Sequence, residues 1–256
     1  MRLSFKKIMN KFVILGGGFL SERLKEISNH ENYDTSILCR DDLDLCDSKN
    51  LIKKLDKYNS EISLLVPASI VRLKGNSIET FLQNVKLAQS IADSLSENVK
   101  KVLYYSSIDV YGNEPKIPIN EDNKILTQDF YSLSKFVSEF IFNHTCETKN
   151  IPLLIYRLPG MYGIGETYPS IITKMIKSAQ FYNSINFVNG IERDFVWVDD
   201  VCELSYQGLN NNNEGIYNIA TGESIALKKV AEIICYKLSK KISIHEKFVS
   251  DNRAKI

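Results

Sequence analysis

Histidine is scarce in this chain, and cysteine occurs without any pairing pattern. The 256 residues include three histidines and five cysteines. The cysteines are odd in number, widely spaced and without a CxxC pair, which is typical of free thiols in a reducing compartment. The histidines are equally scattered, so the sequence predicts no metal site.

An excess of charge of one sign is also absent. Lys and Arg together number 32 against 31 Asp and Glu, a formal net charge of +1. No global field therefore favours nucleic acid or an anionic membrane, and any bound anion must be held locally. The first apolar run, 12–15, is far too short to span a membrane or to form the core of a signal peptide. We expect a cytoplasmic protein with no nucleic-acid or membrane partner.

Apolar segments of strand length alternate with amphipathic segments of helical length. Strands are predicted at 12–15, 35–39, 43–47, 62–66, 101–105 and 152–156, and helices at 20–27, 51–58, 80–95 and 130–142. This alternation predicts the α/β class, with a doubly wound parallel sheet. After residue 159 the alternation of strands and helices becomes less regular. Helices are predicted there at 171–178 and 226–238, and a strand at 195–198 runs into a further helix.

A glycine turn joins the first strand to the first helix. Residues 16–21, GGGFLS, match the pattern GxGxxG except at the last position, where Ser21 stands for glycine. A pyrophosphate must approach backbone N–H groups at a helix N-terminus, where a Cβ would obstruct it. The place of the turn favours a dinucleotide site over a purely structural turn. The expected cofactor contacts here are Gly16, Gly18, Phe19 and Leu20.

Arg40 follows the second predicted strand, where such a sheet presents a residue to the adenosine ribose. A carboxylate there would bind the free hydroxyls of NAD, whereas an arginine suits the additional phosphate of NADP. We therefore expect NADP, with NAD as the alternative. A solvated arginine beside Asp41 and Asp42 is the structural alternative.

Tyr131 and Lys135 lie four residues apart, on one face of the helix predicted at 130–142. An unperturbed tyrosine, with a pKa of about 10, is a poor base near neutrality, but an adjacent cation stabilises the phenolate and lowers that pKa. Tyr236 and Lys240 repeat the spacing. No strand or serine is arranged before this second copy, so we interpret it as coincidence.

The segment 106–112, SSIDVYG, distinguishes the pair Tyr131 and Lys135 from the second pair with the same spacing. It follows a parallel strand, and ligands gather at the carboxyl ends of such strands. A hydroxyl there can hydrogen-bond the substrate oxygen that Tyr131 protonates or deprotonates. A Ser/Asp-rich turn capping a helix is the alternative for this segment alone. Taken together, the motifs predict an oxidoreductase.

In these motifs and their order the chain resembles the extended short-chain dehydrogenase/reductase family, specifically its nucleotide-sugar epimerases, dehydratases and reductases. The resemblance extends to Pro67-Ala68-Ser69, Asn84, 157–165 and 192–201. It implies an NAD(P)-binding Rossmann domain at 1–158, to which 191–214 returns. Residues 159–190 and 215–256 would form a small C-terminal α/β substrate-binding lobe. A nucleotide-sugar substrate and a homodimer are also implied.

The resemblance implies roles for individual residues. Ser107, Tyr131 and Lys135 would be catalytic, and Lys135 would also hold the cofactor ribose. Arg193 would bind the substrate pyrophosphate, with a structural arginine as the alternative. Further cofactor contacts are expected at Leu45, Pro67, Ala68, Ser106, Tyr131, Lys135 and Leu158, and further substrate contacts at Ser69 and Ser107.

The segment 40–47 is similar to that of 4-ketoreductases related to GDP-fucose synthase, which use NADPH through that arginine. The Asp-Glu pair of the dehydratases is Ile108-Asp109 here, so dehydration is not expected. Asp109 replaces the cysteine of GDP-fucose synthase and Ser170 its epimerising histidine, which disfavours combined epimerisation and reduction. Asp109 is a candidate catalytic proton carrier, with helix capping or a solvent-facing position as alternatives.

The leading hypothesis is therefore NADPH-dependent reduction of a 4-keto nucleotide-linked deoxysugar, with Tyr131 protonating the alkoxide. The first alternative is an epimerase that retains NAD. The second is a regulator that binds NAD(P) without catalysis, against which the intact Ser107, Tyr131 and Lys135 argue.

Overall fold

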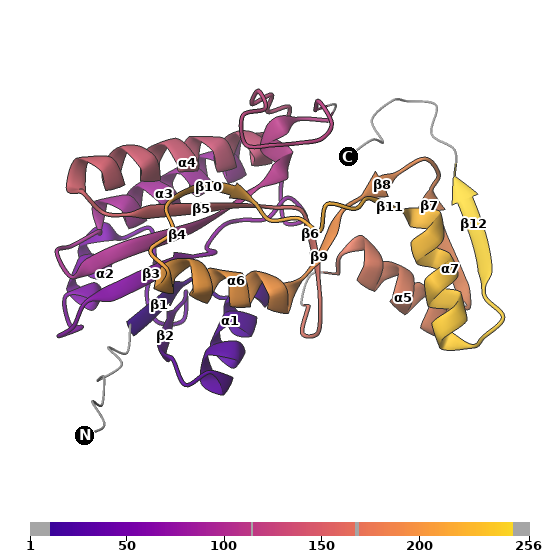
Figure 1. Ribbon diagram of the computed structural model, residues 1–256, viewed down its shortest axis with the longest axis horizontal. Coiled ribbons are helices and arrows are strands. Elements are labelled where there is room, and N and C mark those ends of the chain that lie inside the picture. The colour runs from indigo at the N-terminus through magenta and orange to yellow at the C-terminus, as the bar shows by residue number, and fades with distance from the viewer. Residues whose placement is uncertain (1–10, 114, 167–168, 248–256) are drawn as a thin grey trace, which may run out of the picture.

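The computed structural model describes residues 11–113, 115–166 and 169–247 (Figure 1). Within these ranges the strands are β1 (Lys11–Leu15), β2 (Asp34–Leu38), β3 (Ile62–Val66), β4 (Val99–Ser107), β5 (Leu153–Leu158), β6 (Gly160–Tyr162), β7 (Ser184–Val188), β8 (Glu192–Arg193), β9 (Phe195–Trp197), β10 (Gly215–Asn218), β11 (Ile225–Ala226) and β12 (Ser243–Lys247). The helices are α1 (Phe19–His30), α2 (Ser48–Leu55), α3 (Ile78–Asp93), α4 (Phe130–Lys149), α5 (Ile171–Tyr182), α6 (Val198–Asn210) and α7 (Leu227–Leu238), with a 3-10 turn, η1 (Ile108–Tyr111).

Six strands form one parallel sheet in the order β10-β5-β4-β3-β1-β2. The doubly wound parallel sheet expected from the sequence is confirmed. The chain order reverses at β1, which lies between β2 and β3. Sheets of this kind bind ligands in the crevice outside the carboxyl ends of the strands at such a reversal. The residues that follow β1 and β3 are therefore placed where a ligand would lie.

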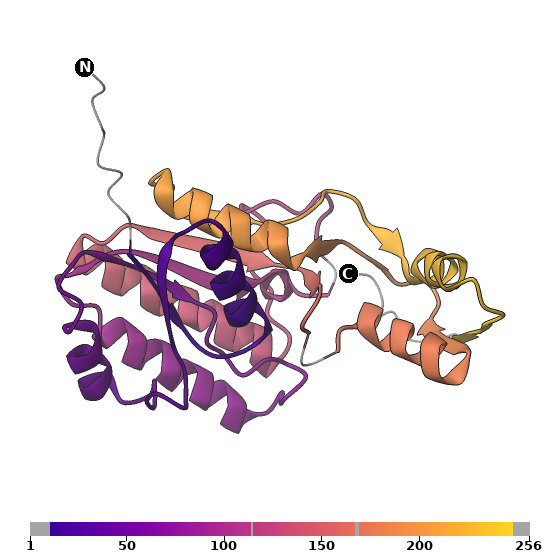
Figure 2. The same cartoon turned by 90° about the horizontal axis from the view of Figure 1, so that it is seen from below.

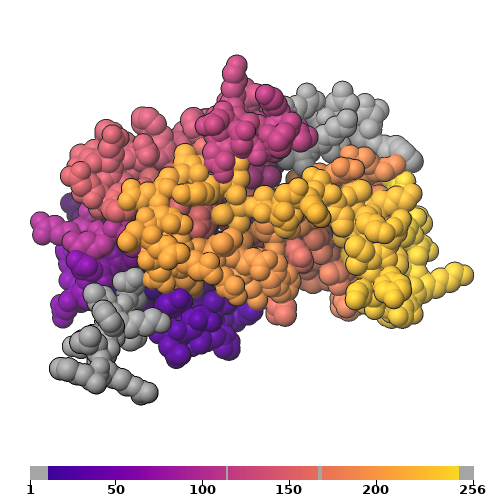
Figure 3. All heavy atoms as spheres, viewed as in Figure 1, coloured from indigo at the N-terminus to yellow at the C-terminus, as the bar shows by residue number. Residues whose placement is uncertain are grey.

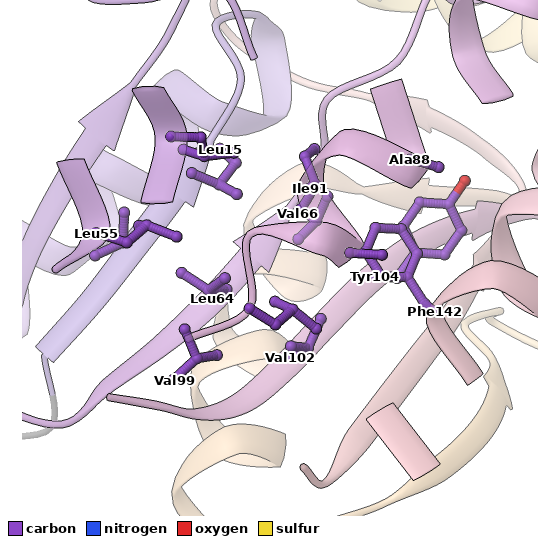
Figure 4. Close-up of a cluster of buried hydrophobic side chains, with 14 of the residues drawn as sticks. Leu15, Leu55, Leu64, Val66, Ala88, Ile91, Val99, Val102, Tyr104 and Phe142 are labelled. Atoms are coloured by element: carbon purple, nitrogen blue, oxygen red, sulfur yellow. The ribbon is translucent and has the colours of Figure 1, made fainter. Parts of the chain in front are cut away.

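Helices cover both faces of this sheet, which explains why β3 is buried along its whole length. On one face α2, α3 and α4 contribute Leu55, Ile91 and Phe142 to a core that also contains Leu15 (Figure 4). On the other face α1 and α6 pack over the second core. Figure 2 shows α6 and α3 on opposite sides of the sheet. None of the helices in the described ranges combines the length and apolarity needed to cross a membrane.

The packing of α1 against α6 is reinforced by an ion pair. Arg23 donates from Nε and Nη2 to the two carboxylate oxygens of Asp199, at 2.5 and 2.7 Å. In Figure 3 the orange atoms of α6 lie directly over the indigo atoms of α1. This pair fixes α1, the helix that begins at the glycine turn, relative to the rest of the sheet.

A smaller lobe lies at the other end of the molecule (Figure 1). It has its own core, in which α5 and α7 pack against the parallel pair β7 and β12. Met175, Ala179, Ile185 and Ala231 are almost completely buried there. Two short pairs, β6 with β9 and β8 with β11, belong to the segments between the large sheet and the lobe.

The strand expected at 43–47 is wrong, because this segment is a turn with irregular backbone. Asp42 accepts a hydrogen bond from the backbone N–H of Cys39 at 2.9 Å, and Asp44 accepts one from Cys46 at 2.9 Å. Aspartate side chains that bond nearby backbone N–H groups compete with a strand ladder. The segment therefore turns back toward α2.

The sequence-based expectation assigned residues from 215 onward to the small lobe. In the structure, residues 215–218 instead form β10, which pairs in parallel with β5 at the edge of the large sheet. Within the described residues the chain thus returns to the large sheet up to Asn218, while α7 and β12 pack in the lobe. Residues 1–10 and 248–256 of the expected ranges lie outside the described residues.

A buried ion pair ties α4 to β5. Arg157 donates to the Glu139 carboxylate from Nε at 3.0 Å and from Nη2 at 2.7 Å, and the two side chains are only 4% and 5% exposed. Arg157 Nη1 also donates to the Tyr111 hydroxyl at 2.7 Å, which in turn donates to Asn218 Oδ1 at 2.8 Å. The network connects α4, β5, η1 and β10.

We predict that Glu139→Gln lowers the free energy of unfolding by about 3 kcal/mol, because it leaves the Arg157 charge buried without its counter-ion. Urea denaturation of the purified protein measures this loss. The control is Lys228→Gln, which breaks the exposed ion pair with Glu246 (3.0 Å) and should cost less than about 1 kcal/mol. Equal losses in the two variants would contradict the prediction.

Candidate active site

The turn between β1 and α1 is tightly packed at two glycines and open at the third. Gly16 has a φ of +128°, and a Cβ there would lie 3.0 Å from the backbone N of Ala68. A Cβ on Gly17 would lie 2.9 Å from Cβ of Cys39. A Cβ on Gly18 would meet no atom within 4 Å. The first two glycines are therefore required by the fold, whereas Gly18 faces open space.

Two features around this turn fit a dinucleotide. Gly18 is the N-cap of α1 and provides no side-chain hydrogen bond to the N–H groups of the first turn, which are the groups that bind phosphate in such folds. At the carboxyl end of β4, the buried hydroxyl of Ser106 has no hydrogen-bond partner among the described residues. Buried polar groups are nearly always paired, so a ligand group beside Ser106 would complete its bonding. The residues present fit the expected cofactor.

We predict that Gly18→Val raises the dissociation constant for the dinucleotide at least about tenfold, because the new side chain would occupy the space in front of α1. Its free energy of unfolding should change by less than about 1 kcal/mol, since nothing in the protein is displaced. Fluorescence titration with NADPH and NADH measures the affinity. Gly16→Val is the contrast, with an expected loss of stability of about 2 kcal/mol or more from backbone strain. Unchanged affinity in Gly18→Val would argue against the site.

Tyr131 lies in the first turn of α4, where several backbone bonds fix its position. Asp129 and Ser132 form a capping box, with the Ser132 N–H donating to Asp129 Oδ1 at 2.8 Å. The backbone N–H of Tyr131 donates to Asn76 Oδ1 at 3.0 Å. The Ser107 hydroxyl lies close enough to the phenol to lower its pKa. The structure thus brings together the serine and tyrosine that the sequence singled out.

The surroundings of Tyr131 determine its ionisation. Burial, followed by the charge of the Asp109 carboxylate, raises the pKa of its phenol well above the usual value. The Arg72 guanidinium and the Ser107 hydroxyl act in the opposite direction and lower that pKa. The phenol is consequently protonated near neutral pH and has a proton to donate.

Lys135 is buried and points toward β4. Its Nζ donates to the carbonyl oxygen of Tyr105 at 2.7 Å and lies 5.1 Å from the centroid of the Tyr104 ring. Burial lowers the pKa of this ammonium group to about 8, although the Glu139 carboxylate opposes the shift. The expected effect of Lys135 on the pKa of Tyr131 stays a prediction. The guanidinium of Arg72 lies over the phenol ring, with its Cζ 5.3 Å from the centroid.

Arg72 was missed by sequence reasoning. It forms ion pairs with Asp109 at 3.1 Å and with Asp129 at 2.7 Å, and so connects the loop after β3 to η1 and to the start of α4. It lies in the turn between β3 and α3, where a charged side chain is usually interpreted as solvated. The available signal was its position, because Arg72 follows the Pro67-Ala68-Ser69 segment at the carboxyl end of a parallel strand.

Arg193 lies on β8 and faces the same group of charges from the side of the lobe. Burial lowers the pKa of its guanidinium, the Asp109 carboxylate opposes this shift, and the Arg72 guanidinium adds to it. Asp109 is therefore paired with Arg72 and is close enough to Arg193 to raise the pKa of that guanidinium. This places the expected substrate arginine beside the expected acid–base residues.

The loop after β3, which contains Pro67, Ala68 and Ser69, is held by Asn84 of α3. The Asn84 side chain is buried, accepts from the Ile70 N–H at 2.7 Å and donates to the Ile70 carbonyl at 3.0 Å. It also donates to the Ser134 hydroxyl at 3.2 Å. The asparagine therefore links this loop to the helix that carries Tyr131.

The remaining expected residues differ in their surroundings. Phe19 packs beneath Gly163, and Arg40 is exposed at the end of β2. Leu20, Leu45 and Leu158 are buried in the cores, with Leu158 next to Ser107 in the strand register. Ser170 caps α5 and its hydroxyl is bonded to Glu166 at 3.1 Å. In the second tyrosine–lysine pair, Tyr236 is 81% exposed and Lys240 lies beyond the end of α7, in agreement with a coincidental match.

A cleft of about 450 Å³ opens between the loop after β3 and the lobe. Leu73 lines one side, and Ser170, Lys174, Met175 and Phe187 line the other. Leu73 directly follows Arg72 in the chain, so the cleft includes a residue of the loop that carries this arginine. A ligand larger than a simple carbonyl compound can therefore be accommodated.

Residues 13–220 match the family described as the NAD dependent epimerase/dehydratase family, and the chain belongs to this family. It is 30% identical to a dTDP-4-dehydro-6-deoxyglucose reductase of Escherichia coli over 182 residues, which are 67% of this chain and 56% of that protein. It is 27% identical to a putative UDP-glucose 4-epimerase of Methanocaldococcus jannaschii over 252 residues, covering 87% of this chain and 80% of that protein.

Solved structures share the fold. A UDP-N-acetylglucosamine 4-epimerase from Bacillus cereus superimposes with a TM-score of 0.82 at 23% identity, covering 93% of this chain and 86% of the other. The Bordetella bronchiseptica enzyme WbmG, in complex with NAD, gives a TM-score of 0.83 at 17% identity, covering 98% and 86%. The resemblance to nucleotide-sugar epimerases, dehydratases and reductases that the motifs indicated is thus confirmed at the level of the family.

Proposed function

We propose that this protein reduces the keto group of a 4-keto nucleotide-linked deoxysugar with NADPH. The observation that carries the proposal is the position of Ser107 at the carboxyl end of β4, where its hydroxyl is close enough to the Tyr131 phenol to lower the pKa of that group, next to a glycine turn that fits a dinucleotide. The Escherichia coli relative is named for the reduction of such a sugar, which supports the same chemistry here.

The protonated phenol of Tyr131 suits the role of proton donor. Its raised pKa, caused by burial and then by Asp109, keeps it protonated until an alkoxide, a stronger base, develops on the substrate. Ser107 would hydrogen-bond the same substrate oxygen and hold it against the phenol. When bound, the nicotinamide supplies the hydride. The chain itself then supplies orientation and the proton.

Other residues would position the two ligands. Lys135, already buried beneath the site, would hold the cofactor ribose, and Gly18 leaves room for the pyrophosphate at α1. Arg193 would pair with the substrate pyrophosphate through charge-assisted hydrogen bonds. The cleft of about 450 Å³ beside Leu73 would receive the rest of the nucleotide.

We predict that Tyr131→Phe lowers the turnover number for a 4-keto deoxysugar nucleotide about a hundredfold or more, because the proton donor is lost. Cofactor affinity should stay within about twofold, since the ring remains. The loss of NADPH absorbance measures the rate. Tyr236→Phe is the matched control, because it alters the second tyrosine–lysine pair and should leave the rate unchanged. Full activity in Tyr131→Phe would refute the assignment of the proton donor.

We predict that Arg40→Ser reduces the preference for NADPH over NADH at least about tenfold, because the guanidinium is proposed to pair with the additional phosphate of NADP. The ratio of kcat/KM for the two cofactors measures this preference. Lys57→Ser, which removes another exposed positive charge, should not change the ratio. A native enzyme that uses NADH as well as NADPH would argue against the proposed cofactor.

The second candidate function is an epimerase that retains NAD. The match to the putative UDP-glucose 4-epimerase favours it, because this match covers more of the chain than the reductase match does. Denaturing the purified protein and identifying the released nucleotide separates the two. Retained NAD, together with interconversion of sugar epimers without net cofactor use, would favour the epimerase.

A further inference from the structure

Arg72 holds a defined position over the Tyr131 ring. Its guanidinium Cζ lies 5.3 Å from the ring centroid. Nη2 pairs with Asp109 at 3.1 Å and with Asp129 at 2.7 Å, so carboxylates from η1 and from the start of α4 fix the group from two sides. Such a paired guanidinium is more restrained than a solvated arginine, although the side chain is still 42% exposed.

We propose that Arg72 is a positioning residue for the acid–base tyrosine: it neutralises Asp109 beside the phenol and stabilises the phenolate that remains after proton transfer. The proposal rests on the acid–base role of Tyr131 in the proposed function. It adds an arginine from the loop after β3 to the charged groups that act on this phenol.

The charges around the phenol determine the direction of the effect. The titratable and charged groups near Tyr131 are Asp109 from η1, Arg72 from the loop after β3, Asp129 at the start of α4, Tyr104 from β4, and Lys135 one turn along α4; Arg193 of β8 lies beyond Asp109. Burial and the carboxylates disfavour the phenolate, and the guanidinium favours it. Removing Arg72 removes the favourable charge and leaves Asp109 without its counter-ion, so both changes raise the pKa of Tyr131.

Lys135 is engaged with β4. Its Nζ donates to the Tyr105 carbonyl at 2.7 Å and lies 5.1 Å from the centroid of the Tyr104 ring. In addition, burial lowers its pKa to about 8, so a part of the population is uncharged in mildly alkaline solution. An arginine stays charged throughout that range.

The experiment titrates position 131 directly. A fluorinated tyrosine, which is more acidic than tyrosine, is incorporated site-specifically at position 131 of the full chain and followed by ¹⁹F NMR against pH, without cofactor or substrate. We expect Arg72→Gln to raise the pKa of this phenol by about one pH unit, a discounted value because Arg72 is partly exposed. Arg72→Lys should raise it less. Asp109→Asn should lower it, and the double variant should return close to the unsubstituted protein.

Lys57→Gln is the control, because it removes an exposed positive charge from the segment before β3, at the other end of that strand from Arg72, and its titration should coincide with that of the unsubstituted protein. An unchanged titration in a folded Arg72→Gln would overturn the proposal. If Arg72→Gln does not fold, Asp109→Asn decides, and a pKa that fails to fall overturns the proposal equally. Because no substrate is present, a protein that reduces no 4-keto sugar would refute the proposed function while leaving this result interpretable.

Discussion

The site depends on the close approach of backbone segments at the carboxyl ends of β1, β2 and β3. The Gly16 N–H donates to the Leu38 carbonyl at 2.8 Å, and the Ala68 N–H donates to the Leu15 carbonyl at 3.0 Å. A side chain at Gly16 would collide with the Ala68 backbone. This contact brings the glycine turn to the loop after β3, which carries Arg72 toward η1 and α4. Cofactor turn and acid–base residues therefore share one structural constraint.

Helix α4 connects the site to the framework. Asp129 and Tyr131 at its start belong to the site, whereas Glu139, two turns further on, forms the buried pair with Arg157. Lys135 lies between them and contacts β4. A shift of this helix would therefore disturb the phenol, the lysine and the ion pair together. The buried pair is best understood as a means of fixing one orientation of α4, because ion pairs of this kind add little to net stability.

The local motifs were predictable from the sequence, because each is a short pattern with a mechanical reason. The glycine turn, Ser107 and Tyr131 lie at the ends of the expected elements, and the structure brings the serine close enough to the tyrosine to lower the pKa of its phenol. Features that depend on distant partners were not predictable. Arg72 acquires its role from Asp109 and Asp129, and β10 acquires its place by pairing with β5. The strand predicted at 43–47 was wrong because the side chains of Asp42 and Asp44 accept hydrogen bonds from nearby backbone N–H groups.

The surroundings of Asp109 bear on which reaction of the family the site favours. A carboxylate at this position, following the proposed catalytic serine, is a candidate for moving a proton. In the structure its Oδ2 is engaged by Arg72, and its charge also faces Arg193. Asp109 is thus the counter-ion of Arg72, the guanidinium that lies over the phenol. With Asp109 in that role, the proposal leaves Tyr131 as the proton donor, and one proton delivered to one oxygen is what a ketone reduction requires. The arrangement of charges thus supports reduction more directly than it supports a reaction needing a second proton carrier.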